Sequence, residues 1–135
     1  MTPVLGTPSR RTVLVVEDAL TTRCILEQFF ARSGCEVVQA ADPDMAIKRL
    51  NSTHIDAVIL DLKLGRERSG LEVLEQMRLE DRFAHLPVVI LTGVEVVEPK
   101  EMEIIERHGA HLLYKQLGYR QVVERLEQII TRAAA

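Results

Sequence analysis

Four short runs of apolar residues each lead directly into polar side chains, and this pattern constrains the fold more than any other feature. The clearest run is Val58-Ile59-Leu60, which is followed by Asp61. Uninterrupted apolar runs of this length suit strands that are covered on both faces, as in parallel sheets. The other runs are residues 13–16 before Glu17 and Asp18, residues 88–91 before Thr92, and residues 112–114 before Lys115. Because open α/β sheets place ligand sites at the carboxyl ends of their strands, we expect these side chains to meet there.

Helical patterns alternate with the apolar runs along the chain. Strands are expected at about 12–16, 36–40, 56–61, 87–92 and 111–114, and helices at about 20–33, from Asp42-Pro43, from near Gly70, from Pro99 and over the last residues. The last helix has the strongest periodicity, at Val122, Leu126, Ile129 and Ile130. Five strands alternating with five helices predict an α/β fold, a doubly wound five-stranded parallel sheet of the flavodoxin-like (βα)5 type. Its strand order, 2-1-3-4-5, would bring Glu17, Asp18 and Asp61 together, with Thr92 and Lys115 beside Asp61.

The composition fits one domain and bears on several classes of function. The chain has 135 residues and a formal charge of −3, which argues weakly against nucleic acid or an anionic membrane as the main partner. No run approaches the roughly 18 apolar residues of a membrane span. Residues 1–10 are expected to be a flexible leader and residues 11–135 the domain. Cys24 and Cys35 lack metal-ligand spacing and are interpreted as buried residues of a reduced, cytoplasmic protein.

The expected cluster has a definite chemistry. Three carboxylates repel each other unless a cation or a proton relieves them, and a few hard oxygen ligands suit Mg²⁺ better than zinc. A carboxylate can also attack phosphorus and form an aspartyl phosphate. Asp61 is the natural nucleophile, and Asp18 is the expected metal ligand with Glu17 beside it. Lys115 and Thr92 could hold two phosphoryl oxygens.

Glu17-Asp18, Asp61, Thr92 and Lys115, each after its own strand, resemble the receiver domain of two-component response regulators, over about residues 11–133. The resemblance implies that Asp61 takes a phosphoryl group from a histidine kinase or histidine phosphotransfer protein in a phosphorelay. It implies Mg²⁺ bound by Asp18, Asp61 and the main-chain carbonyl of Lys63, with Glu17 acting through water. Thr92 and Lys115 would then follow the phosphoryl group and reshape the face made by the fourth helix, the fifth strand and the last helix.

The chain departs from the receiver pattern near its fifth strand. Receivers usually have a cis proline after the lysine, where this chain has Gln116, so that turn is expected to be trans or rearranged. The switch aromatic three residues before the lysine is replaced by Leu112, and Tyr114 precedes the lysine directly. The phosphorylation chemistry is therefore carried over and the aromatic switch is not. Lys63 and Val94 occupy positions where the family tunes dephosphorylation.

Two other classes of function stay open. A module of the same fold that binds partners without phosphorylation would explain the unusual fifth-strand region. The other class is an enzyme, either a flavin protein or a phosphohydrolase. The loop after the first strand lacks a Ser/Thr/Gly-rich phosphate cradle, and Asp61-Leu62-Lys63 lacks the second aspartate of haloacid-dehalogenase-like hydrolases.

The leading hypothesis is therefore a signalling switch whose only chemistry is self-catalysed phosphotransfer and dephosphorylation. After the fifth strand only the last helix and a short Ala-rich tail remain, so we expect either a stand-alone receiver or a receiver excised from a hybrid kinase or a larger regulator. Its output would be a contact with a downstream protein effector or with a second copy of the chain.

Overall fold

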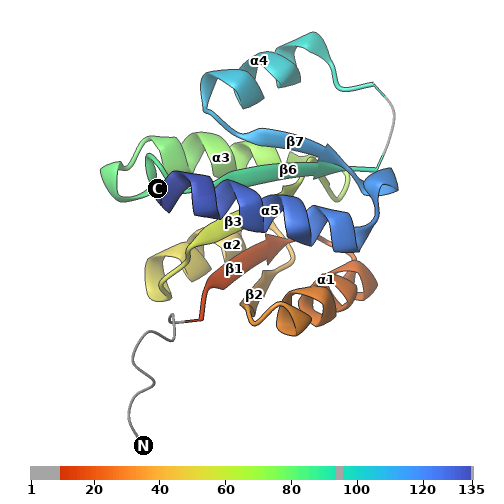
Figure 1. Ribbon diagram of the computed structural model, residues 1–135. Helices are drawn as coiled ribbons and strands as arrows, with labels where there is room; N and C mark the ends of the chain where they lie inside the picture. The colour runs from red at the N-terminus through yellow and green to blue at the C-terminus, as the bar shows by residue number, and fades with distance from the viewer. Residues whose placement is uncertain (1–9, 94–95, 135) are drawn as a thin grey trace, which may run out of the picture.

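A five-stranded parallel sheet forms the centre of the molecule (Figure 1). The computed structural model describes residues 10–93 and 96–134. The strand order is β2-β1-β3-β6-β7, and every neighbouring pair in this sheet is parallel. The strands are β1 (Thr12–Val16), β2 (Glu36–Ala40), β3 (Ala57–Asp61), β6 (Val88–Thr92) and β7 (His111–Tyr114). In order along the chain these are strands 2-1-3-4-5 of the sheet, so the predicted doubly wound fold is confirmed.

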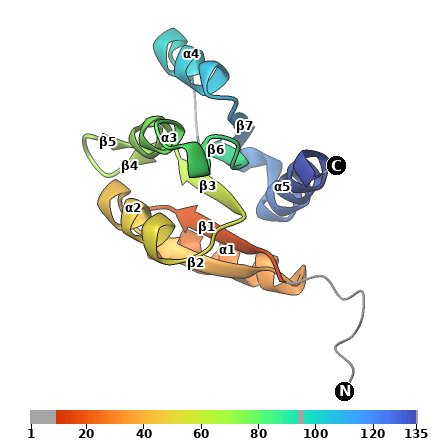
Figure 2. The ribbon, with the colours of Figure 1, turned by 90° about the vertical axis from the view of Figure 1, so that its left-hand side faces the viewer.

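Five helices cover the two faces of the sheet. They are α1 (Leu20–Arg32), α2 (Pro43–Ser52), α3 (Gly70–Arg78), α4 (Pro99–Arg107) and α5 (Tyr119–Ala134). Short 3-10 turns, η1 (Asp81–Phe83) and η2 (Lys115–Leu117), follow α3 and β7. Figure 2 shows α2 and α3 on one side of the sheet and α5 on the other.

The central strand shows why its apolar run is continuous. Val58 and Leu60 point into the core shared with α2, α3 and α4, whereas Ile59 points into the core shared with α1 and α5. Because both faces of β3 are covered, every one of its residues is buried, including Asp61 at its end. A strand in this position needs apolar side chains on both faces, so the single carboxylate at its end stands out.

Local signals in the sequence set the helix boundaries. Asp42 caps α2 by accepting a hydrogen bond from the main-chain N–H of Met45, with Pro43 at the first helical position. Ser69 and Glu72 form a capping box at the start of α3. Gly34 follows α1 with a φ of 83°, a conformation that glycine adopts without strain.

The structure corrects two expectations. The segment after Asp61, where no strand was predicted, contains a small antiparallel hairpin made by β4 (Lys63–Leu64) and β5 (Arg68–Ser69). Cys24 is exposed rather than buried, because α1 turns Leu26 and Phe30 inward and Cys24 lies two positions from that stripe. Cys35 is buried as expected, and neither of these two cysteines forms a disulfide.

Two expectations fall partly or wholly outside the described residues. The predicted leader is described only at Arg10, and Val94 is not described. Within the described residues, no helix combines the length and the apolar character needed to cross a bilayer.

Candidate metal and phosphoryl site

The register of the sheet brings the acidic residues to one edge. Val16 pairs with Leu60, so Glu17, the next residue after β1, comes beside Asp61, the last residue of β3. Asp18 follows Glu17 in the turn that leads to α1. The predicted convergence at the switch point between β1 and β3 therefore follows directly from strand pairing.

The same register places Thr92 and Lys115 at this edge. Asp61 pairs with Leu91 on β6, and Thr92 pairs with Tyr114 on β7. Thr92 is therefore one residue further along than the partner of Asp61, and Lys115 follows Tyr114. Thr92 is buried, with 4% of its surface exposed.

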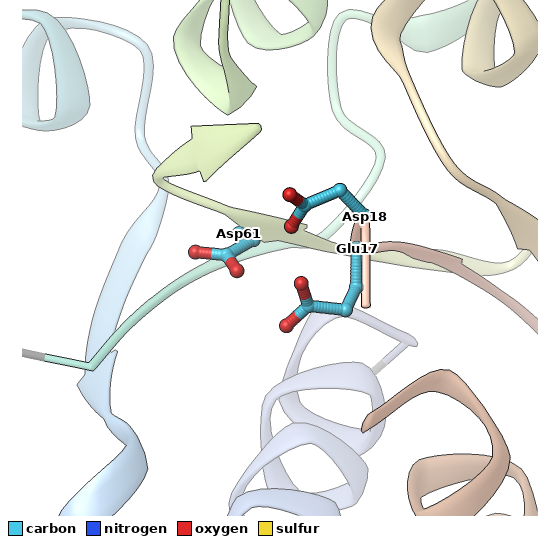
Figure 3. A group of neighbouring side chains, drawn as sticks. All are labelled: Glu17, Asp18 and Asp61. Carbon is cyan, nitrogen blue, oxygen red and sulfur yellow. The ribbon is translucent and has the colours of Figure 1, made fainter. Parts of the chain in front are cut away.

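The three carboxylates form a compact cluster (Figure 3). Glu17, Asp18 and Asp61 each offer one oxygen, and these oxygens all lie within 4.8 Å of one another. Glu17 and Asp61 are 3% and 7% exposed, whereas Asp18 is exposed. Two buried carboxylates this close repel each other by about 3 kcal/mol at an effective dielectric constant of about 20, so the cluster needs positive charge.

Lys115 supplies part of that charge. Its Nζ lies 2.9 Å from Oε1 of Glu17 and 3.0 Å from Oδ2 of Asp61. Partial burial lowers the pKa of Lys115, but the hydrogen bonds and the charges of the two carboxylates outweigh it, and the pKa is raised overall. The lysine is therefore charged throughout the physiological range.

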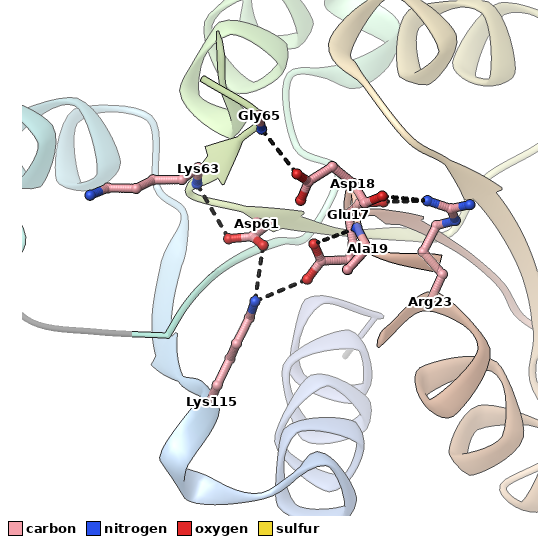
Figure 4. Close-up of polar contacts among 8 residues, drawn as sticks. All are labelled: Glu17, Asp18, Ala19, Arg23, Asp61, Lys63, Gly65 and Lys115. Carbon is pink, nitrogen blue, oxygen red and sulfur yellow. Dashed lines mark hydrogen bonds and ion pairs between the residues drawn. The ribbon is translucent and has the colours of Figure 1, made fainter. Parts of the chain in front are cut away.

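Main-chain N–H groups hold the carboxylates from other directions (Figure 4). The donor–acceptor pairs are Ala19 to Glu17 at 3.1 Å, Lys63 to Asp61 at 3.3 Å, and Gly65 to Asp18 at 3.2 Å. Each carboxylate thus accepts one such bond. The β4–β5 hairpin contributes two of the three donors, so it is part of the site.

The residues present fit a small divalent cation. Three carboxylates and one ammonium leave the cluster with a net charge of −2, which one divalent cation would balance. The donors are all hard oxygens, as Mg²⁺ requires, and the exposed Asp18 leaves one side open to the waters that Mg²⁺ retains. The acidic cluster can therefore hold a metal ion.

All the predicted site residues that the structure describes lie at this edge. Glu17, Asp61 and Lys115 are in direct contact, and Asp18 completes the acidic cluster. Thr92 is placed there by strand pairing, and Lys63 by its N–H bond to Asp61. The roles predicted for Thr92 and for the carbonyl of Lys63 stay predictions.

Two contributors were not foreseen. Gly65 donates to Asp18, and Arg23 donates to the main-chain carbonyls of Glu17 and Asp18. Gly65 gave no usable signal, since its contact depends on the hairpin. Arg23 did carry a sequence signal. It lies in the first turn of a helix, at the end of the helix macrodipole where cations are disfavoured.

The turn after Lys115 is held by the residue that departs from the receiver pattern. Nε2 of Gln116 donates to the main-chain carbonyl of Gly93 at 2.9 Å. A Cβ added at Gly93 would lie 3.5 Å from Cδ of Lys115, so the stem of the lysine runs alongside this loop. Over residues 10–93 and 96–134 there is no cis peptide bond.

The acidic cluster and Lys115 thus form one charged site at the carboxyl edge of a parallel α/β sheet. A family model for the response regulator receiver domain matches residues 13–127, which is most of the chain. The chain therefore belongs to the response regulator receiver domain family, a family of signalling switches rather than of enzymes in the usual sense.

Curated relatives share this region. The chain is 26% identical over 114 residues to the regulatory protein VirG of Agrobacterium fabrum, covering 84% of this chain and 44% of that protein. It is 29% identical over 108 residues to the CAI-1 autoinducer sensor kinase/phosphatase CqsS of Vibrio cholerae, covering 79% of this chain and 15% of that protein. The chain spans less than half the length of either protein.

Solved structures show the same fold. A CheY-like receiver domain protein from Methanospirillum hungatei aligns with a TM-score of 0.83 at 19% identity, covering 93% of this chain and 98% of that one. A receiver protein from Pseudomonas putida aligns with a TM-score of 0.79 at 25% identity, covering 90% and 99%.

Proposed function

We propose that this receiver domain is a phosphorylation switch in which Asp61 accepts a phosphoryl group in the presence of Mg²⁺. The observation that carries the proposal is the setting of Asp61. Its carboxylate is nearly buried, lies in a cluster with two other carboxylates, and contacts the ammonium of Lys115. A carboxylate so placed has a cation beside it on one side and room for a metal ion on the other.

The proposed transfer forms one bond and breaks one. An oxygen of Asp61 attacks phosphorus, and the bond from phosphorus to the donor's histidine nitrogen breaks. The electron pair of that bond stays on the nitrogen, which takes a proton from solvent. No group is oxidised or reduced.

Each neighbouring residue has a role in this proposal. Asp18 and Asp61, with the carbonyl of Lys63, would hold Mg²⁺, and Glu17 would act on it through water. When bound, Mg²⁺ offsets the negative charge of the incoming phosphoryl oxygens. Lys115, already within reach of Asp61, would pair with one phosphoryl oxygen, and the hydroxyl of Thr92 would donate to another.

The proposed partners follow from the family. The donor is a histidine kinase or a histidine phosphotransfer protein, and the output is a contact with a protein effector or with a second copy of the chain. In CqsS, a protein described as a sensor kinase/phosphatase, a similar region forms part of a longer chain. Equal binding of an effector by the wild type and by Asp61→Asn would instead favour the phosphorylation-independent module.

Treatment with a small acyl phosphate tests the proposal without knowledge of the natural donor. With Mg²⁺ present, intact-protein mass spectrometry should show the gain of one phosphoryl group, and chelation of Mg²⁺ should prevent it. Asp61→Asn should abolish the gain, whereas Asp81→Asn, an exposed aspartate in η1, should leave it unchanged. Labelling of Asp61→Asn equal to that of the wild type would refute the assignment.

A further inference from the structure

Arg23 makes a set of contacts behind the acidic pair that the proposed chemistry does not use. Its Nη1 donates to the carbonyl of Glu17 at 2.7 Å and to the carbonyl of Asp18 at 3.3 Å (Figure 4). Both acceptors are main-chain oxygens. The guanidinium therefore holds the backbone of the two acidic residues and makes no hydrogen bond to their carboxylates.

The guanidinium is itself held from the opposite side. Its Nε donates to Oε1 of Gln39 on β2 at 2.9 Å, and Nε2 of Gln39 donates to Oε1 of Glu27 on α1. Arg23 is half-buried, so these bonds are partly shielded from water. The chain of contacts joins α1, β2 and the turn after β1.

The position of Arg23 is costly unless these contacts matter. It is the fourth residue of α1, near the end of the helix dipole that repels cations, and no acidic residue lies in that first turn. Its hydrogen bonds are with neutral oxygens rather than carboxylates. Its charge also lies close to the site proposed for a divalent cation, which it would repel.

We propose that Arg23 is a positioning residue for the metal site, which fixes the turn carrying Glu17 and Asp18 so that their carboxylates face Asp61. This inference rests on the proposed function, since it assigns Arg23 to the same Mg²⁺ site. Outer residues that orient metal ligands typically contribute about tenfold or more to metal affinity. Lys115 acts differently from Arg23, because its ammonium donates hydrogen bonds to the carboxylate oxygens themselves.

The two possible effects of Arg23 have opposite signs. If Arg23 acts only as a nearby positive charge, its removal strengthens Mg²⁺ binding, because repulsion falls. If it positions the acidic pair, its removal weakens Mg²⁺ binding, because Asp18 and Glu17 are no longer held facing Asp61. The direction of the change in affinity therefore separates positioning from simple electrostatics.

The test is Mg²⁺ affinity, measured by isothermal titration calorimetry on the full chain. Arg23→Met is expected to weaken binding about tenfold, and Arg23→Lys, which keeps the charge but loses the planar fork, should weaken it less. Gln39→Leu should also weaken Mg²⁺ binding, although the side chain of Gln39 makes no hydrogen bond to Glu17 or Asp18. Arg32→Met is the matched control, because Arg32 lies on the same helix and stacks over Phe29 instead.

The outcomes are distinguishable. Unfolding in urea shows whether each variant is folded. If Arg23→Met does not fold, the Mg²⁺ affinities of Arg23→Lys and Gln39→Leu still test the positioning role. Mg²⁺ binding by Arg23→Met as tight as that of the wild type, or tighter, would overturn the positioning role while leaving the metal site intact. Failure of the wild type to bind Mg²⁺ would overturn the proposed function, and this inference with it.

Discussion

Nζ of Lys115 lies 3.0 Å from Oδ2 of Asp61, across 54 residues of sequence. The same ammonium lies 2.9 Å from Glu17, so a single cation bridges the ends of β1 and β3 from the end of β7. The ammonium thereby links β7 by charge to two strands with which it does not pair in the sheet, since β6 lies between β3 and β7.

Replacement of the lysine should destabilise the metal-free protein. Lys115→Met leaves two buried carboxylates without their cation, and we expect a loss of about 1 to 3 kcal/mol in the free energy of unfolding. Urea unfolding in the presence of a chelator measures it. Mg²⁺ should reduce the difference in free energy of unfolding between Lys115→Met and the wild type, because the divalent cation then neutralises the carboxylates.

Lys48→Met serves as the control for this loss, because Lys48 is exposed on α2. It should change the free energy of unfolding little, with or without Mg²⁺. An equal gap between Lys115→Met and the wild type in chelator and in Mg²⁺ would contradict the view that lysine and metal neutralise the same carboxylates.

The stabilisation that Lys115 provides should also change with pH in the alkaline range. The pKa of Lys115 is raised in the folded state above the ordinary lysine value of 10.5. A raised pKa means that the stabilisation is fully present below pH 10.5 and is lost as the pH rises through the folded-state value. The difference in free energy of unfolding between the wild type and Lys115→Met should therefore be constant below that pH and shrink above it. A difference that grows with alkaline pH would contradict the assignment.

Gly70 should be intolerant of any side chain. A Cβ at this position would lie 2.3 Å from the main-chain oxygen of Asp61, and that oxygen cannot move without shifting the site. Gly70→Ala should therefore destabilise the protein by about 2 to 3 kcal/mol and weaken Mg²⁺ binding.

Gly34→Ala is the control for Gly70, because Gly34 has open space around its Cβ position but a φ of 83°. We expect it to cost about 1 kcal/mol, from backbone conformation alone, and to leave Mg²⁺ affinity unchanged. If Gly70→Ala were no more destabilising than Gly34→Ala, the close approach to Asp61 would not hold.

Gln116 should affect the rate of phosphorylation more than metal binding. Gln116→Glu keeps the size of the side chain but removes the donor to Gly93, which frees the turn that carries Lys115. With the loss of one hydrogen bond worth about 1 kcal/mol, labelling by an acyl phosphate should slow by about fivefold. Gln128→Glu on the exposed face of α5 makes the same change of charge elsewhere and should leave the rate unchanged.

The fold was predictable because its signals are local and repeated. Val58, Ile59 and Leu60 are apolar on both faces of one strand, and Asp42 and Pro43 mark a helix start without reference to the rest of the chain. Strand pairing then follows from the alternation of strands and helices, and it places Asp61 beside Glu17.

The parts that were missed depend on contacts between distant segments. The β4–β5 hairpin has only two residues in each strand, too few for a periodic pattern. The exposure of Cys24 depended on which face of α1 meets the sheet, and the apolar residues of that helix gave only a weak preference. The hydrogen bond from Gly65 to Asp18 joins residues 47 apart and carries no sequence signal.

Chemical location of the phosphoryl group tests the central claim most directly. Borohydride reduces an aspartyl phosphate to homoserine, which fragmentation mass spectrometry can assign to a single residue. After treatment with an acyl phosphate and Mg²⁺, the account predicts homoserine at position 61 and at no other aspartate. Homoserine at another aspartate, or none at position 61 in protein that has gained a phosphoryl group, would contradict it.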